Sequence, residues 1–274
     1  MSNLYLIVCV FNKFKSMKTK AIIIISTIAL FVTMELLGQD TIDYKTVFPS
    51  GISVGYGQGL YSVKDEYISE EKYSGTIPYL SVGWARKHNK YLYRLEFEYR
   101  SSDEIMNYNV STNITQVTLN QGFLYPLKKR ELFNKDLDLW IGPSTEFFFF
   151  YNKPNIAISG FDYSQSIAAL FSVGINIAGN YSLNSKFQIE SLISTSVVSL
   201  GFRMVDMEED DQSPVKLLTL FSGLNSSFDL GIRYYVLNNL SIKAGYKFEL
   251  FRISAWNPLI STSDNLLIGL TYNF

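Results

Sequence analysis

The chain has 274 residues, of which 47% are hydrophobic, 15% aromatic and only 18% charged, and its formal net charge is −1. Soluble domains carry about 25% charged residues, so this chain is charge-poor, and its near-neutral balance argues against nucleic acid as a partner. The mean hydropathy of +0.07 excludes a bundle of membrane-spanning helices, because each such helix needs about 20 consecutive apolar residues. A membrane-spanning β-sheet stays compatible with this composition, since only every second residue of its strands faces lipid.

The N-terminal part of the chain predicts an export signal. Lysines precede the apolar run Ala21 to Met34, and the small residue Gly38 follows it, as in the three regions of a secretory signal peptide. The run is short for a helix that crosses about 30 Å of hydrocarbon, and Glu35 interrupts it, so a membrane anchor is disfavoured. We therefore predict that residues 1–38 contain a signal peptide, and that Met1 to Ser16 form an upstream extension of it if Met17 is the true start. The only cysteine, Cys9, falls in this part, so the predicted mature chain forms no disulfide.

The last ten residues, NLLIGLTYNF, alternate like a strand with one apolar face. Leu266, Ile268, Leu270, Tyr272 and Phe274 are apolar at every second position. A period of two places them on the same side of a strand, with Asn, Gly and Thr residues mostly on the other side.

Ten segments after residue 49 show this period of two. In the cleanest, residues 91–101, Tyr, Leu and Phe alternate with Arg and Glu; in 215–237 the alternation places Leu218 and Leu220 on the apolar face. Every segment reaches the roughly 9–11 residues that a tilted strand needs to cross a bilayer. The segments are 50–63, 76–87, 91–101, 112–126, 137–151, 164–183, 186–203, 215–237, 240–256 and 264–274.

The connections between these segments alternate in length. His88–Lys90, Leu183–Ser185 and Asn238–Asn239 are tight and rich in turn residues, whereas the odd-numbered connections are longer and mostly polar. Barrels with short periplasmic turns and long external loops show this alternation, and an even strand count returns both termini to the periplasm. The sequence therefore predicts an all-β fold, a transmembrane antiparallel up-and-down β-barrel of about ten strands over residues 50–274. Eight or twelve strands remain open, because residues 152–163 have room for a further hairpin.

These features together resemble the small outer-membrane β-barrel proteins of Gram-negative bacteria, over the signal and essentially all of residues 50–274. The resemblance implies insertion into the cell outer membrane, with outer-membrane lipid and lipopolysaccharide as surroundings and residues 39–49 as a short periplasmic segment. In such proteins a terminal aromatic residue is an insertion signal, so Leu270, Tyr272 and Phe274 are expected to engage the barrel-insertion machinery. The motifs are generic to the architecture, so they identify no subfamily and leave the oligomeric state open.

Strand parity assigns charged side chains of both signs to the interior. The interior of a barrel of about eight to ten strands is barely wider than its side chains, and an unpaired buried charge costs several kcal/mol. We therefore expect opposite charges to pair into a plug, which makes the protein a structural or interaction protein of the cell envelope. The alternative is a narrow channel or transport accessory for small polar solutes. The predicted lumen charge network is Arg94, Glu96, Glu98, Arg100, Asp138, Glu146, Glu190, Asp229, Arg233, Lys243, Lys247 and Glu249.

Catalysis and cofactors are not expected. Omptin-like proteases, deacylases and phospholipases of the outer membrane depend on a His near the outer face, whereas the only histidine, His88, falls in a predicted periplasmic turn. The sequence has no zinc pattern, phosphate-binding glycine loop or dinucleotide fingerprint. Two predicted external loops are acidic, one from Asp65 to Glu71 and one from Asp206 to Asp211, and we expect their carboxylates to be solvated rather than to bind Ca²⁺.

Overall fold

The computed structural model describes residues 50–107, 110–127, 130–132, 135–155, 165–204 and 213–274. The predicted signal peptide and the predicted periplasmic segment 39–49 lie outside this part of the chain. Among the described residues, no helix is both long and apolar enough to cross a membrane.

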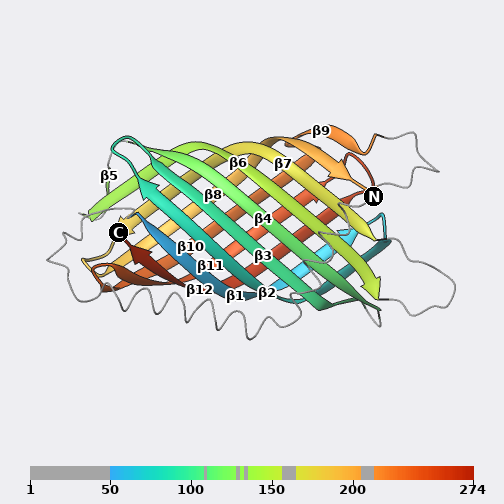
Figure 1. The fold of residues 1–274 in the computed structure, drawn as a ribbon, viewed down its shortest axis with the longest axis horizontal. Helices are drawn as coiled ribbons and strands as arrows, with labels where there is room; N and C mark the ends of the chain where they lie inside the picture. Colours follow the sequence, from blue (N-terminus) through green and yellow to red (C-terminus); the bar gives the residue numbers. More distant parts are fainter. Residues whose placement is uncertain (1–49, 108–109, 128–129, 133–134, 156–164, 205–212) are drawn as a thin grey trace, which may run out of the picture. The chain divides into compact units, whose positions relative to one another are not determined.

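The described part of the chain is built from β-strands, drawn in Figure 1. Their bounds are β1 (Gly51–Asp65), β2 (Ser69–Lys87), β3 (Leu92–Asn107), β4 (Val110–Pro126), β5 (Arg130–Leu132), β6 (Lys135–Asn155), β7 (Ser166–Ser182), β8 (Phe187–Arg203), β9 (Val215–Thr219), β10 (Gly223–Leu237), β11 (Leu240–Ile253) and β12 (Leu259–Asn273).

The sheet closes on itself through the pairing of β1 with β12. Their register runs without a break from Gly51↔Asn273 to Asp65↔Leu259, and β1 pairs with β2 on its other edge. The ring then continues through β3, β4, β6, β7, β8, β10 and β11 back to β12, with every neighbour antiparallel. Ten strands thus form a closed wall without a free edge, which confirms the predicted all-β, up-and-down barrel. The short strand β5 pairs only with β6.

The two ends of the barrel differ in their connections. The backbone N–H of Phe274 donates to the Ser50 carbonyl at 3.0 Å, so the first and last strands begin and end together. We call this the terminal end, where residues 88–91, 183–186 and 238–239 connect strands, and the opposite end the loop end.

Two predicted long loops at the loop end are mostly strand. Only residues 66–68 separate β1 from β2, and β3 reaches Asn107 while β4 begins at Val110. The expectation of long external loops was wrong at these two connections. Backbone pairing continues there, for example between Lys64 and Lys72, although the side chains no longer alternate between apolar and polar.

The predicted strand 215–237 is interrupted. The chain turns over residues 220–222 between β9 and β10, where the N–H of Ser222 donates to the Thr219 carbonyl at 2.9 Å. An odd number of inserted residues reverses the facing of a strand, because side chains alternate with a period of two. Leu218 is therefore fully buried inside the barrel and Leu217 is 72% exposed, the reverse of the predicted assignment.

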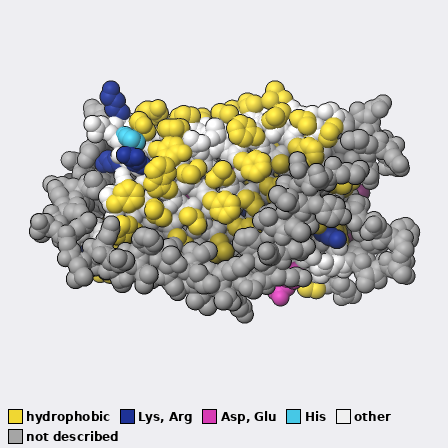
Figure 2. Space-filling model, in the orientation of Figure 1, with side chains coloured by type: hydrophobic (Ala, Val, Ile, Leu, Met, Phe, Trp, Pro, Cys, Tyr) yellow, Lys and Arg dark blue, Asp and Glu magenta, His cyan; other side chains and the backbone are white. Residues whose placement is uncertain are grey.

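The outer wall of the barrel is apolar. Figure 2 shows apolar side chains spread over the middle of the wall, with Lys and Arg side chains toward its two ends. On β12, Leu266, Ile268 and Leu270 are exposed and Tyr272 is partly exposed, and Phe274 directly after the strand is also exposed. A continuous apolar exterior of this extent is typical of a wall that faces lipid.

The loop-end half of the lumen contains an aromatic core. The alternation of side chains along the sequence predicted a charged interior and did not predict this core. The Phe148 and Phe251 rings stack with centroids 4.1 Å apart, and Phe150 lies 6.4 Å from Phe251. Because β6 and β11 are not neighbours in the ring, these contacts cross the lumen. The core comprises Tyr61, Val63, Tyr73, Ile77, Ile105, Ile114, Phe148, Phe150, Ala168, Leu170, Leu218, Phe251, Ile253, Trp256 and Leu259.

We expect Phe251→Ala to lower the free energy of unfolding by about 3–5 kcal/mol, because it leaves a cavity in this aromatic core. Phe171→Ala is the matched control, since Phe171 is 54% exposed on the outer wall while Phe251 is 2% exposed. Lipid chains can fill the space that Phe171→Ala opens. We therefore expect Phe171→Ala to lower the free energy of unfolding by at least about 1 kcal/mol less than Phe251→Ala does. Denaturant unfolding in lipid vesicles measures both, and equal losses would contradict a packed core.

Candidate functional site

The candidate site is the charged part of the lumen, between the aromatic core and the terminal end. Alternation along the strands turns every member of the predicted charge network toward the interior. The structure divides these side chains into separate groups rather than one network: a central layer, an amide-bound Glu146, the wall of a cavity, and Asp138, which lies buried on β6 opposite Asn180.

The central layer joins β3 to β11 across the lumen. Arg100 forms an ion pair with Glu249, and Lys247 forms one with Glu98. Further contacts link Lys247 Nζ to Glu249 Oε1 at 3.1 Å and Arg100 Nη2 to Glu98 Oε2 at 3.6 Å. β12, β1 and β2 lie between these two strands in the ring, and all four residues are at most 9% exposed. The layer therefore bridges the lumen between β3 and β11.

Neighbouring groups complete the surroundings of the central layer. The Tyr79 ring lies 4.7 Å from Arg100 Cζ and 5.4 Å from Lys247 Nζ, within cation–π distance. Ser263 Oγ accepts a hydrogen bond from Arg100 Nη1 at 3.0 Å and donates to Glu249 Oε2 at 2.8 Å. Two cations thus face two carboxylates in the layer, and such mutual pairing offsets much of the cost of burying charge.

Glu146 has different partners from those expected. Among the described residues, this carboxylate accepts hydrogen bonds from the side-chain amides of Asn225 and, at 3.3 Å, of Asn120, and it forms no ion pair there. Asn120 also contacts Ser194 Oγ at 3.4 Å. The expectation of a charge partner is therefore not met at this position, because amide donors from β4 and β10 satisfy the carboxylate instead.

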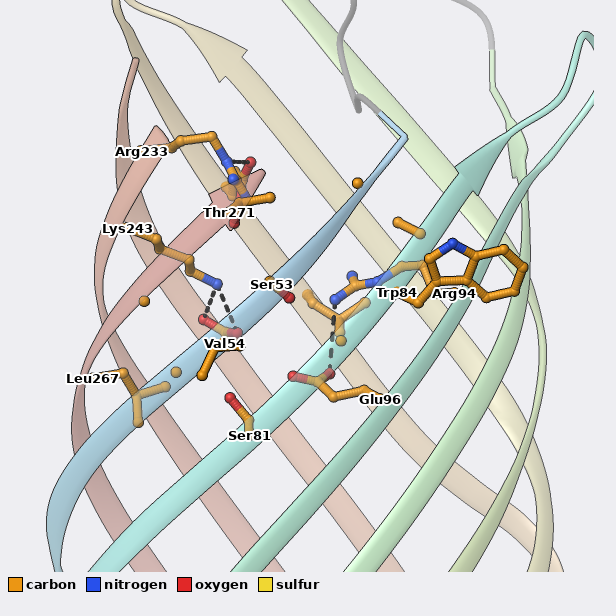
Figure 3. Close-up of a pocket in the computed structure, with 18 of the residues that line it drawn as sticks. Ser53, Val54, Ser81, Trp84, Arg94, Glu96, Arg233, Lys243, Leu267 and Thr271 are labelled. Carbon is orange, nitrogen blue, oxygen red and sulfur yellow. Dashed lines mark hydrogen bonds and ion pairs between the residues drawn. The ribbon is translucent and has the colours of Figure 1, made fainter. Parts of the chain in front are cut away.

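A cavity of ≈ 120 Å³ lies on the terminal side of the central layer (Figure 3). Arg233 binds Glu190 through two nitrogens, at 2.5 and 2.9 Å, and Lys243 Nζ lies 2.8 and 2.9 Å from the oxygens of Asp229. These partners stand on neighbouring strands, β8 with β10 and β10 with β11.

A third pair, Arg94 with Glu96, lies on β3 itself, with 3.7 Å between Arg94 Nη2 and Glu96 Oε2. Figure 3 shows these charged side chains around the open space together with Ser53, Ser81 and Thr271. All three pairs run along the wall instead of across it, so the cavity stays open between them. The terminal half of the lumen therefore combines this open, charge-lined space with a buried apolar cluster of Leu92, Leu124, Trp140 and Ala178.

A buried polar cluster near the loop end was missed by the sequence argument. Asp65 is 2% exposed and forms an ion pair with the fully buried Arg203. Asn152 donates to Asp65 Oδ2 at 3.3 Å, and Arg203 also donates to the Asn257 carbonyl. We call Asp65, Asn152 and Arg203 the loop-end clasp, since it ties β1, β6 and β8 together.

The prediction that Asp65 is a solvated loop carboxylate was therefore wrong. Asp65 shares the inward face of β1 with Tyr61 and Val63. If the first predicted strand had been extended from residue 63 to residue 65, the alternation would have placed Asp65 on that inward face. The other acidic stretch, Asp206 to Asp211, lies outside the described residues.

The single histidine lies away from the lumen. His88 is exposed in the β2–β3 connection, where its ring stacks on Tyr91 with centroids 4.6 Å apart. Within the described part of the chain, no group of three or more His, Cys, Asp or Glu side chains is arranged to hold a metal ion.

No known protein-family profile matches the sequence, and no curated protein matches it. Solved structures with a similar course of the chain include the outer membrane protease OmpT from Escherichia coli, with 10% identity, a TM-score of 0.48 and coverage of 85% of this chain and 100% of that one. Neisserial surface protein A (NspA) gives 11% identity, a TM-score of 0.36 and coverage of 81% and 97%. Ail of Yersinia pestis gives 10% identity, a TM-score of 0.31 and coverage of 83% and 100%.

The architecture itself rests on the strand pairing of this chain. A closed, even-stranded antiparallel barrel with an apolar exterior and a polar lumen is the architecture of outer-membrane β-barrels.

Lys247→Met should lower the free energy of unfolding by about 3–5 kcal/mol, because it leaves Glu98 and Glu249 buried with only Arg100 to share. Lys243→Met is the matched control, since Lys243 and Asp229 border the cavity, and we expect it to cost about 1 kcal/mol. Adding Glu98→Gln to Lys247→Met should restore part of the loss. Unfolding in lipid vesicles measures all three, and equal effects of the two lysine variants would argue against a buried central layer.

Proposed function

We propose that the protein is an integral outer-membrane barrel that does not conduct and that serves as a structural or interaction protein of the cell envelope. The apolar outer wall supports the membrane location, and the predicted signal peptide supports export to it. In this proposal the terminal end faces the periplasm, in keeping with its tight turns and with the even strand count.

The observation that supports the proposal is that side chains meet across the lumen at two successive levels. The central layer spans from β3 to β11, and the aromatic core spans from β6 to β11. A polar solute would have to separate buried ion pairs and then cross a layer packed mostly with aromatic and aliphatic side chains. Each step is unfavourable on its own, because buried charges resist loss of their partners and apolar packing excludes water.

A closed lumen leaves the outer wall and the loop end as the working surfaces. At the loop end, the proposed partners are lipopolysaccharide and components outside the cell. At the terminal end, Leu270, Tyr272 and Phe274 lie on the outward side of the last strand, where the barrel-insertion machinery could recognise them.

A narrow channel or transport accessory is the second candidate, and the cavity beside Arg94, Arg233 and Lys243 is the observation that favours it. This cavity would serve as the periplasmic vestibule of a pathway for small polar solutes. It ends at the central layer, so transport would require the pairs of Arg100 and Lys247 to separate.

Purified, refolded protein should give no steady single-channel current in planar bilayers. Phe148→Ala/Phe251→Ala should also stay closed, because the central layer remains. Adding Arg100→Ala/Glu249→Ala removes one of the two ion pairs of the central layer, which opens space beside the remaining Lys247–Glu98 pair and should produce small steady currents. Heat-dependent migration on gels confirms that each variant is folded. Steady currents from the unmodified protein would overturn the closed-lumen proposal and favour the channel.

A further inference from the structure

The outer wall carries a concentrated aromatic patch at the terminal end of β2, β3 and β4. The Trp84 and Tyr93 rings lie 5.4 Å apart, and Tyr93 and Phe123 lie 5.0 Å apart. Tyr91 continues the group, 5.9 Å from Phe123 and 6.2 Å from Tyr125. Aromatic rings with this exposure gather where a bilayer changes from hydrocarbon to headgroups, so the patch marks that level on the wall.

Basic side chains adjoin the same patch. Arg86 pairs with Tyr93 in the register of β2 and β3, so both point outward side by side. His88 and Lys90 follow in the exposed connection, and His88 stacks on Tyr91. Figure 2 shows dark blue and cyan side chains next to the apolar ones at the left end of the view.

The patch has no acidic counterpart. The sequence from Lys72 to Leu95 contains no Asp or Glu, and neither does β4. The next carboxylate, Glu96, pairs with Arg94 inside the lumen. None of the ion pairs among the described residues involves Arg86 or Lys90. The cations are therefore available to an anion that approaches from the bilayer.

We propose that Arg86, His88 and Lys90, together with the Trp84–Tyr93–Phe123 aromatic patch, form a binding site for the phosphate headgroup of an anionic glycerophospholipid. The aromatic rings contact the upper acyl chains and glycerol, the cations Arg86 and Lys90 contact the phosphate, and the His88 ring lies between them in the chain. The site is one-sided. The β10–β11 connection at the same end is Asn238–Asn239 without charge, and the β7–β8 connection on the opposite side of the ring has only Lys186.

The chain contains its own reporter for this site. Of its three tryptophans, Trp84 is 36% exposed on the outer wall, whereas Trp140 and Trp256 are each 6% exposed. Bromine on lipid acyl chains quenches tryptophan fluorescence only at short range. Quenching by brominated lipid therefore reports the lipid that sits beside Trp84, and Trp84→Phe should abolish the lipid-dependent part of the signal.

The experiment compares brominated phosphatidylglycerol with brominated phosphatidylcholine, each at a low mole fraction in unlabelled phosphatidylcholine vesicles that contain the full chain. We expect the anionic lipid to associate at Trp84 more strongly than the zwitterionic one, by about fivefold for each cation of the site. In Arg86→Gln/Lys90→Gln, the ratio of quenching by brominated phosphatidylglycerol to quenching by brominated phosphatidylcholine should fall close to the value expected for bulk lipid. Lys186→Gln removes a charge at the same membrane level on the other side of the ring and should leave the ratio unchanged.

Equal quenching by both lipids in the unmodified protein would overturn the site, and so would an unchanged preference in Arg86→Gln/Lys90→Gln. An equal drop in Lys186→Gln would also overturn it, since the preference would then reflect general surface charge. Absence of quenching by either lipid would overturn the lipid-facing placement of the wall itself. None of these results depends on whether the lumen conducts.

Discussion

The constraint on which the rest of the structure depends is that backbone hydrogen-bonding groups cannot stay unpaired in hydrocarbon. The unbroken β1–β12 register satisfies it by closing the sheet. Once the sheet is closed, alternate side chains must point to two very different surroundings, lipid outside and a narrow lumen inside. The apolar wall, the central layer and the aromatic core are consequences of that single division.

Within the lumen, charge and apolar packing take separate levels. The three ion pairs around the cavity each join residues of the same strand or of adjacent strands. They therefore stay close to the barrel wall and leave space between them. The pairs of Arg100 and Lys247 reach across the lumen to another part of the ring. Whether a balanced set of charges closes a barrel therefore depends on which strands hold the partners, and not only on the number of each sign.

Period-two alternation predicted the barrel, its strand number and the inward facing of residues such as Glu98 and Lys247, because alternation is a local property of one strand. Partners across the lumen depend on tilt and on the stagger between distant strands, which no single segment contains. Leu218 was placed on the wrong face because the turn after β9 reverses parity. Asp65 was taken for a loop residue because its strand continues where apolar alternation has stopped.

Strand β11 presents Lys247, Glu249 and Phe251 at three consecutive inward positions. The first two contact β3 and the third contacts β6, while the loop-end clasp joins β1, β6 and β8. The barrel is thus cross-braced along several diameters, which makes flattening of its cross-section under lateral bilayer pressure costly. A tube of this stiffness holds the ends of its loop-end hairpins at fixed separations, so these hairpins form a rigid platform.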